Sequence, residues 1–155
     1  MATQHQNSTQ LDLSQVPSAK NMRFVLVVSE WNSQITENLF VGAENVLLEK
    51  GAKTVDRVDV PGSFELIYGA RCQFDKNYDA IITIGSVIRG ETKHFDYVCQ
   101  AVSHGVKDLN LLGKTPVIFC VLTDENVQQA IDRSGGVLGN KGAEAAVAAI
   151  RMATL

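Results

Sequence analysis

The chain has few cysteines and no paired cysteine spacing. Only three cysteines occur in 155 residues, Cys72, Cys99 and Cys120, and none forms a Cys-x-x-Cys pair. An odd, unpaired set argues against a disulfide framework and against a zinc site. Because all three lie in apolar patterns, we expect them to be small core residues of a protein in a reducing compartment.

Long apolar runs and a surplus of positive charge are also missing. No run reaches the roughly 18 apolar residues that a membrane span needs, and the polar start lacks the apolar segment of a signal peptide. The formal charge is -3, which argues against non-specific nucleic-acid binding, because that binding depends on Lys and Arg. We therefore expect a cytoplasmic protein that binds neither membrane nor nucleic acid.

The length of 155 residues suits one domain. We predict a polar amino-terminal tail at residues 1–21 and a single domain at residues 22–155. The composition of the tail leaves two alternatives open, disorder or docking on a neighbouring subunit.

Apolar, β-branched runs alternate with helical patterns along the predicted domain. The run RFVLVVS at 23–29 is followed by apolar residues at three- and four-residue steps that end at Gly51. The unit then recurs, with strands predicted at 54–60, 80–88 and 115–123, helical segments at 61–74, 90–109 and 124–135, and a last helix at 140–153. Parallel strands need such crossovers on both faces of a sheet. We predict an α/β fold, a three-layer α/β/α sandwich with a flavodoxin-like parallel sheet of four or five strands.

Familiar nucleotide and hydrolase signatures are absent. The first strand is not followed by Gly-x-Gly-x-x-Gly, and the chain has neither a Gly-x-x-x-x-Gly-Lys-Ser/Thr loop nor a Gly-x-Ser-x-Gly elbow. A receiver domain would place Asp at the ends of the first and third strands, where Glu30 and Ser86 stand. Ligands of open parallel sheets bind beyond the carboxyl ends of the strands, so the segments that leave the four predicted strands are the candidate site.

The segment after the third strand combines a glycine with a histidine. Gly90 permits a close turn, and the amides of Glu91, Thr92 and Lys93 are predicted to open a helix whose dipole favours an anion. His94 would lie in the first turn, where a neutral ring able to accept a proton is favoured. The alternative is that Thr92 caps the helix and His94 only packs or faces solvent.

The segment PGSFE follows the second strand. We predict that Ser63 caps the next helix and that Glu65 lies in its first turn, where the dipole favours a carboxylate. Capping alone would explain both residues.

Taken together, the strand exits resemble the lumazine synthase family of riboflavin biosynthesis. The resemblance covers nearly all of residues 22–154 and rests on SEWNSQITENLFVGA, VPGSFE, GSVIRGETKHFDYV, FCVLTDENVQQAIDRSG and GNKG, in the family's order and spacing. Members condense 5-amino-6-(D-ribitylamino)uracil with 3,4-dihydroxy-2-butanone 4-phosphate to give 6,7-dimethyl-8-ribityllumazine, and they need neither metal nor cofactor. The resemblance thus implies two small-molecule substrates, a pyrimidinedione and a sugar-derived phosphate.

The resemblance assigns the pyrimidinedione to three segments. It implies that the ring of Trp31 stacks on the heterocycle, although a tryptophan that merely covers the strand end is the alternative. It assigns the ribityl chain and the edge of the heterocycle to Ser63, Phe64, Glu65, Ser86, Val87 and Ile88. An ordinary strand end is the alternative for the last three.

The resemblance assigns the phosphate to Glu91, Thr92 and Arg133, and proton transfer to His94. A cation such as Arg133 is also favoured in a last helical turn by the helix dipole alone. Phe119 and Lys141 match positions that reach into the site of an adjacent subunit. Their alternatives are a core phenylalanine and a solvated helix start.

The resemblance also implies a homo-oligomer, because a site shared between chains is incomplete in a monomer. The family forms pentamers that often assemble into icosahedral shells, and riboflavin synthase is an expected partner. The RSGGVLGNKG loop is as long as in shell-forming members, although Val137 replaces their usual lysine. Two rival functions keep the fold without the chemistry: a flavin or lumazine carrier, and a structural cage protein.

Overall fold

The computed structural model of the chain describes residues 11–113 and 115–155. Its main sheet has four parallel strands in the order β2-β1-β3-β4, which is the flavodoxin-like order. The strands are β1 (Arg23–Ser29), β2 (Thr54–Val60), β3 (Ala80–Ile88) and β4 (Val117–Asp124). The predictions of an α/β fold and of a parallel sheet are confirmed, with four strands in that sheet.

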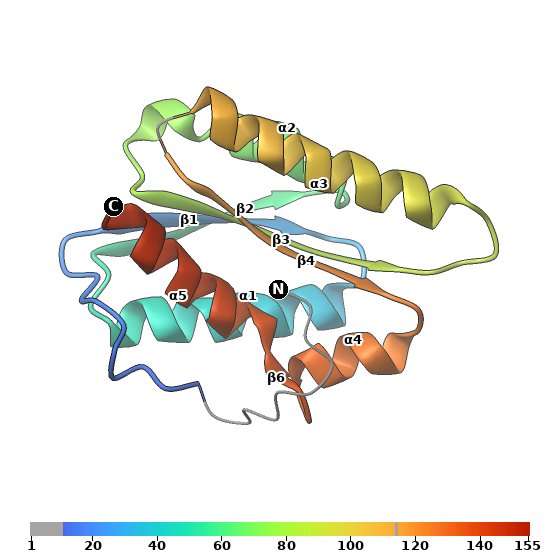
Figure 1. The fold of residues 1–155 in the computed structure, drawn as a ribbon, viewed down its shortest axis with the longest axis horizontal. Helices are drawn as coiled ribbons and strands as arrows, with labels where there is room; N and C mark the ends of the chain where they lie inside the picture. Colours follow the sequence, from blue (N-terminus) through green and yellow to red (C-terminus); the bar gives the residue numbers. More distant parts are fainter. Residues whose placement is uncertain (1–10, 114) are drawn as a thin grey trace.

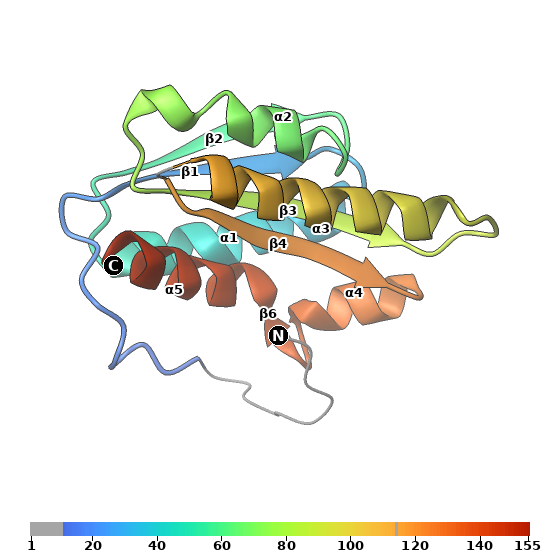
Figure 2. The same ribbon diagram turned by 45° about the horizontal axis from the view of Figure 1, so that its top comes forward.

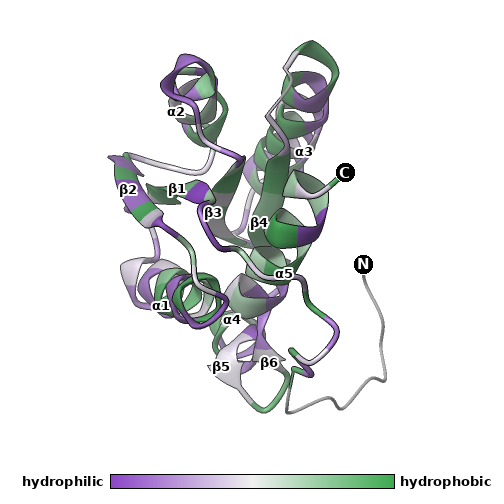
Figure 3. Cartoon of the chain, turned by 90° about the vertical axis from the view of Figure 1, so that its left-hand side faces the viewer, coloured by the Kyte–Doolittle hydropathy of each residue, from purple (hydrophilic) through white to green (hydrophobic). Residues whose placement is uncertain are grey.

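Helices cover both faces of the sheet, so the three-layer prediction is also confirmed (Figures 1 and 2). Helices α2 and α3 lie on one face, and α1, α4 and α5 lie on the other (Figure 3). The helices are α1 (Ser33–Glu49), α2 (Leu66–Arg71), α3 (His94–Leu112), α4 (Val127–Arg133) and α5 (Lys141–Ala153), with a short 3-10 turn at Phe74–Lys76. None of the helices in the described part of the chain is long and apolar enough to cross a membrane.

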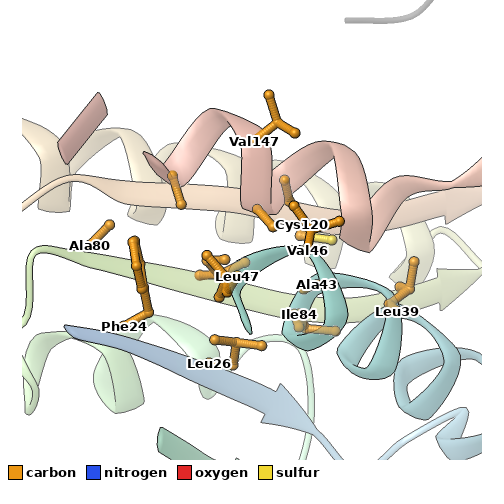
Figure 4. Packing of buried hydrophobic residues seen from close by; sticks show 14 of the residues in the cluster. Phe24, Leu26, Leu39, Ala43, Val46, Leu47, Ala80, Ile84, Cys120 and Val147 are labelled. Carbon is orange, nitrogen blue, oxygen red and sulfur yellow. The ribbon is translucent and has the colours of Figure 1, made fainter. Parts of the chain in front are cut away.

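Side chains that alternate along the strands build a separate core under each helical layer. On β1, Phe24, Leu26 and Val28 face α1 and α5, whereas Val25 and Val27 face α2 and α3. Figure 4 shows the larger core, where the side chains of α1 and α5 meet those of the sheet. The strands β1 and β3 are buried on both faces, which explains their continuous apolar sequences.

The structure places several boundaries differently from the sequence prediction. Helix α2 ends at Arg71, and α3 begins at His94 rather than at Glu91, with bends and a turn over residues 91–93. A small antiparallel hairpin, β5 (Ser134–Gly136) and β6 (Gly139–Asn140), was not predicted. Three-residue and two-residue strands are too short to leave a hydrophobic period in the sequence.

The segment before β1 is only partly described. Residues 1–10 of the predicted tail lie outside the described residues, and its docking on a neighbouring subunit stays a prediction. Within residues 11–21, Val16 and Ala19 are buried in the larger core, and the Ala19 amide donates to the Lys50 carbonyl oxygen at 2.8 Å. This part of the segment therefore packs against the end of α1 in the same chain.

The prediction that all three cysteines lie in the core is wrong for two of them. Cys120 is buried, but Cys99 is only partly buried and Cys72 is exposed. Cys99 lies on the amphipathic helix α3, and Cys72 is the residue that follows the end of α2. At such positions an apolar pattern in the sequence does not distinguish the buried face of a helix from the margin of that face. Burial raises the pKa of the Cys120 thiol to about 12.

Candidate functional site

The carboxyl ends of the four parallel strands meet at one edge of the sheet, and a hollow of about 580 Å³ opens there. It brings together the ends of β1, β2 and β3 with the start of α4. Its lining includes Trp31 and Ile88 from the sequence-predicted site, and seven residues that the sequence did not single out for binding: Glu30, Asn32, Ser33, Gln34, Ile35, Pro61 and Val127. The hollow thus lies where the fold class predicts a ligand.

Trp31 projects from this edge, with 72% of its surface exposed. A side chain on Gly62 would begin 3.5 Å from Trp31 Cδ1 and 3.0 Å from Glu65 Oε2. Gly62 therefore keeps open the space between the indole and the carboxylate. An aromatic ring this exposed is not a core residue, and its face is free for a planar ligand.

Asn32, next to Trp31, was missed as a site residue. It has left-handed backbone angles, φ 56° and ψ 45°, and its side-chain amide donates to the Ser86 carbonyl oxygen at 2.8 Å. Its own carbonyl oxygen accepts the first hydrogen bonds of α1, from Ile35 and Thr36. Asparagine tolerates this conformation better than most residues do, so the combination fixes the exit of β1 against the end of β3.

Ser63 does not cap α2, and that prediction is wrong. The amino-terminal capping position is Glu65, without a side-chain cap, because two turn residues follow Ser63 before the helix begins. The side chain of Ser63 turns inward instead, where its hydroxyl would lie 2.7 Å from a Cβ at Gly85. Phe64, by contrast, is 55% exposed.

Four buried polar atoms at this edge have no hydrogen-bond partner among the described residues. They are Ser29 Oγ, Ser63 Oγ, Ser86 Oγ and Asp124 Oδ2, one near the carboxyl end of each strand. Buried polar groups without partners are rare because each costs about 1–3 kcal/mol. Their concentration at one edge indicates a surface built for polar contacts. Ser29 and Asp124 were missed, although a polar residue that ends an apolar strand is the signal that could have found them.

The loop after β3 is anchored by Arg89, which the sequence also did not single out. Arg89 Nε lies 2.6 Å from Glu125 Oε2, and its Nη2 lies 3.0 Å from Asp96 Oδ1. Its guanidinium also lies 4.2 Å from the ring centre of Phe95. Arg89 therefore joins the β3 exit to α3 and to the β4 exit.

His94 is the first residue of α3 and is exposed. The Thr92 hydroxyl accepts a hydrogen bond from the His94 amide at 3.3 Å, and Glu91, Thr92 and Lys93 are exposed as well. The backbone of His94 is thus held by Thr92, and its imidazole is exposed rather than packed into the core. Thr92 is not the capping residue of α3, because Lys93 holds that position without a side-chain cap, so the capping alternative is wrong. Phosphate binding by Thr92 stays a prediction.

Arg133 ends α4 and reaches back toward the sheet. Its Nη1 donates to the Gln129 carbonyl oxygen at 3.0 Å and lies 3.8 Å from Asp124 Oδ1. Burial raises the pKa of the Asp124 carboxyl above its ordinary value, and the Arg133 guanidinium opposes part of that rise. The exposed part of Arg133, about one third of its side chain, is available to an anion.

Phe119 and Lys141 do not line the hollow. Phe119 lies within β4, opposite Thr83, and is 42% exposed, which excludes the core alternative. Lys141 begins α5, where its ammonium group binds Glu144 Oε1 at 2.7 Å. The two residues belong to the β4 edge and its neighbouring helix. Within the described residues, no group of three or more His, Cys, Asp and Glu side chains is arranged to hold a metal ion.

Comparison with known proteins gives matches along nearly the whole chain. A family model described as 6,7-dimethyl-8-ribityllumazine synthase matches residues 21–155. A protein of Flavobacterium johnsoniae with that name is 58% identical, over 99% of this chain and 82% of the relative. Relatives of the same name from Christiangramia forsetii and Parabacteroides distasonis are 55% and 50% identical, over at least 98% of this chain and at least 95% of their own lengths.

Proposed function

The chain belongs to the 6,7-dimethyl-8-ribityllumazine synthase family, and we propose that the carboxyl edge of its sheet is where it performs the family's reaction. It is a transferase of riboflavin biosynthesis that condenses 5-amino-6-(D-ribitylamino)uracil with 3,4-dihydroxy-2-butanone 4-phosphate. The observation that supports this location is the hollow at the strand ends, which is lined by Trp31. Unpartnered buried polar atoms also lie near these strand ends.

The pyrimidinedione binds against Trp31 in this proposal. The exposed indole stacks on the planar ring, and the backbone of Ser86, Val87 and Ile88 meets the edge of the heterocycle. The Asn32 side chain fixes the carbonyl group of Ser86, so that strand end is held in place before the substrate arrives. Ser63, Phe64 and Glu65 bind the ribityl chain, whose hydroxyls suit a carboxylate acceptor.

The phosphate of the second substrate binds between the start of α3 and the end of α4. The residues that precede α3 lie at the positive end of the helix dipole, which favours an anion, and the Thr92 hydroxyl adds a donor. Arg133 supplies a planar cation that matches a phosphate better than lysine does. The Glu91 carboxylate, which is exposed, faces away from the phosphate, while its amide binds.

The reaction then needs few chemical groups from the protein. The 5-amino group and the ketone form an imine with loss of water, proton transfers through His94 allow phosphate to leave, and the second amine closes the ring with loss of a further water. Arg133 and the start of α3 stabilise the departing phosphate. Holding two reactants together supplies much of the rate gain, so His94 accelerates the proton transfers rather than making the reaction possible.

Phe119 and Lys141 complete the site of an adjacent subunit in this proposal. Neither lines the hollow of its own chain, and Phe119 exposes an aromatic ring on the edge strand of the sheet. The chain accordingly assembles as a homopentamer, with an icosahedral shell as the further assembly and riboflavin synthase, which consumes the product, as the partner. The enzyme works in the cytoplasm.

The test is to mix the purified protein with both substrates and to follow the absorbance and fluorescence of the lumazine. The expected result is product formation well above the uncatalysed rate. In an Arg133→Gln variant, the KM for the butanone phosphate should rise more than the KM for the pyrimidinedione. Folded and assembled protein that gives no acceleration would instead favour the carrier or the cage.

A further inference from the structure

Asp124 is a buried carboxylate that the proposed reaction does not use. It ends β4 opposite Ile88, and only 4% of its surface is exposed. Its backbone oxygen accepts a hydrogen bond from the Arg89 amide at 3.0 Å. One side-chain oxygen, Oδ2, has no hydrogen-bond partner among the described residues.

The other side-chain oxygen faces Arg133, the residue proposed to bind phosphate. Asp124 Oδ1 lies 3.8 Å from Arg133 Nη1, which is ion-pair distance but too long for a good hydrogen bond. The same Nη1 already donates to the Gln129 carbonyl oxygen at 3.0 Å. The carboxylate is thus close enough to act on the guanidinium electrostatically, without a bidentate bond that would occupy it.

The placement of Asp124 does not favour the stability of the fold. A buried charge with one unpartnered oxygen and one loose ion pair loses more hydration energy than its contacts return. A neutral residue of similar shape would avoid that cost. The neighbouring carboxylate on α4, Asp132, is arranged differently, because it accepts a hydrogen bond from the Gln128 side chain at 2.8 Å.

We propose that Asp124 acts on phosphate binding through Arg133, because its carboxylate competes with phosphate for the guanidinium. A phosphate at Arg133 brings a second negative group toward the buried carboxylate, and the repulsion weakens the hold on phosphate. The phosphate released by the reaction therefore leaves readily, and Arg133 returns to Asp124. The inference rests on the proposed function, in which Arg133 binds the phosphate of the substrate.

Calorimetric titration of the assembled protein with inorganic phosphate tests the proposal. Asp124→Asn keeps the shape and removes the charge, and it should bind phosphate roughly three- to tenfold more tightly, the size expected for a partly buried charge effect. Asp132→Asn removes the same charge one residue from Arg133 and should change the dissociation constant less than about twofold. In an Arg133→Gln background, Asp124→Asn should have no further effect.

Steady-state kinetics give a second readout that a structural role would not produce. Asp124→Asn should lower the KM for the butanone phosphate and strengthen inhibition by inorganic phosphate, while the KM for the pyrimidinedione stays unchanged. If Asp124→Asn fails to fold, Asp124→Thr removes the charge with a residue that favours strands, and it should give the same tighter binding. Thermal unfolding of each variant separates folding from binding.

The outcomes separate the inference from the function on which it rests. If Arg133→Gln leaves phosphate binding unchanged, the proposed role of Arg133 is wrong. If Arg133→Gln weakens binding but Asp124→Asn behaves like Asp132→Asn, the role of Arg133 stands and the competition is overturned. Weaker phosphate binding in Asp124→Asn would also overturn it, because Asp124 would then only orient the guanidinium.

Discussion

At the scale of single residues, the placement of His94 limits what it can contribute. It is exposed at the first position of α3, and only its backbone amide is held, by the Thr92 hydroxyl at 3.3 Å. No core contact fixes its ring, so its loss should leave the fold intact. A residue placed in this way can move protons for a bound substrate but does little to bind it.

We predict that His94→Ala lowers kcat about 100-fold, the low end of the range for general acid–base catalysis, with both KM values nearly unchanged. The matched control is His104→Ala, which removes an exposed histidine from the middle of the same helix. Initial rates of lumazine formation measure both variants. Wild-type kinetics in His94→Ala would exclude it as the proton shuttle, and an equal loss in His104→Ala would point to damage to α3.

At the scale of elements, α1 and α5 pack together at a glycine. A Cβ at Gly142 would overlap the Leu39 carbonyl oxygen and lie 2.6 Å from the carbonyl carbon. Asn140 strengthens the same junction, since its side chain caps α5 and donates to the Asn38 carbonyl oxygen at 2.9 Å. The close approach of two backbones therefore depends on the absence of a side chain at Gly142.

We predict that Gly142→Ala destabilises the protein by about 2 kcal/mol or more, even though alanine is the better helix former. The overlap involves backbone atoms, which cannot move aside as a flexible side chain can. Chemical denaturation of the purified variant measures the free energy of unfolding. Gly90→Ala is the control, because no atom lies within 4 Å of its Cβ position; an equal loss in both variants would contradict the packing argument.

The sequence predicts helices and strands well where the pattern of apolar residues continues over a long stretch. The residues of β1, β2 and β3 agree with the prediction, as does the end of α1 before Gly51, which has φ 88°. The failures at Ser63 and at the start of α3 have another cause. Both depend on where a turn gives way to a helix, and this is decided by tertiary contacts such as the inward turn of Ser63 toward Gly85.

At the scale of the whole molecule, the position of the site is easier to predict than its composition. Parallel strands bring their exits to one edge, which is enough to predict that Trp31 and Ile88 line one hollow. Asn32 and Arg89 act through contacts between different exits, and such pairings leave no local pattern in a sequence. These two residues could be found only from the folded chain.

The assembled molecule offers the sharpest test of the proposed shared site. In the proposed pentamer, one subunit supplies His94 and its neighbour supplies Phe119 and Lys141. We predict that His94→Ala and a Phe119→Ala/Lys141→Ala double variant are each impaired, and that subunits dissociated and reassembled together at equal amounts recover activity. A complete site forms where a double-variant subunit, which keeps His94, meets a His94→Ala subunit, which keeps Phe119 and Lys141. Each position is filled by the required variant half of the time, so about a quarter of the sites regain wild-type function.

Sedimentation establishes assembly before and after mixing, and variants mixed without dissociation are the control. Reassembled pentamers that gain no activity would place the whole site within a single chain.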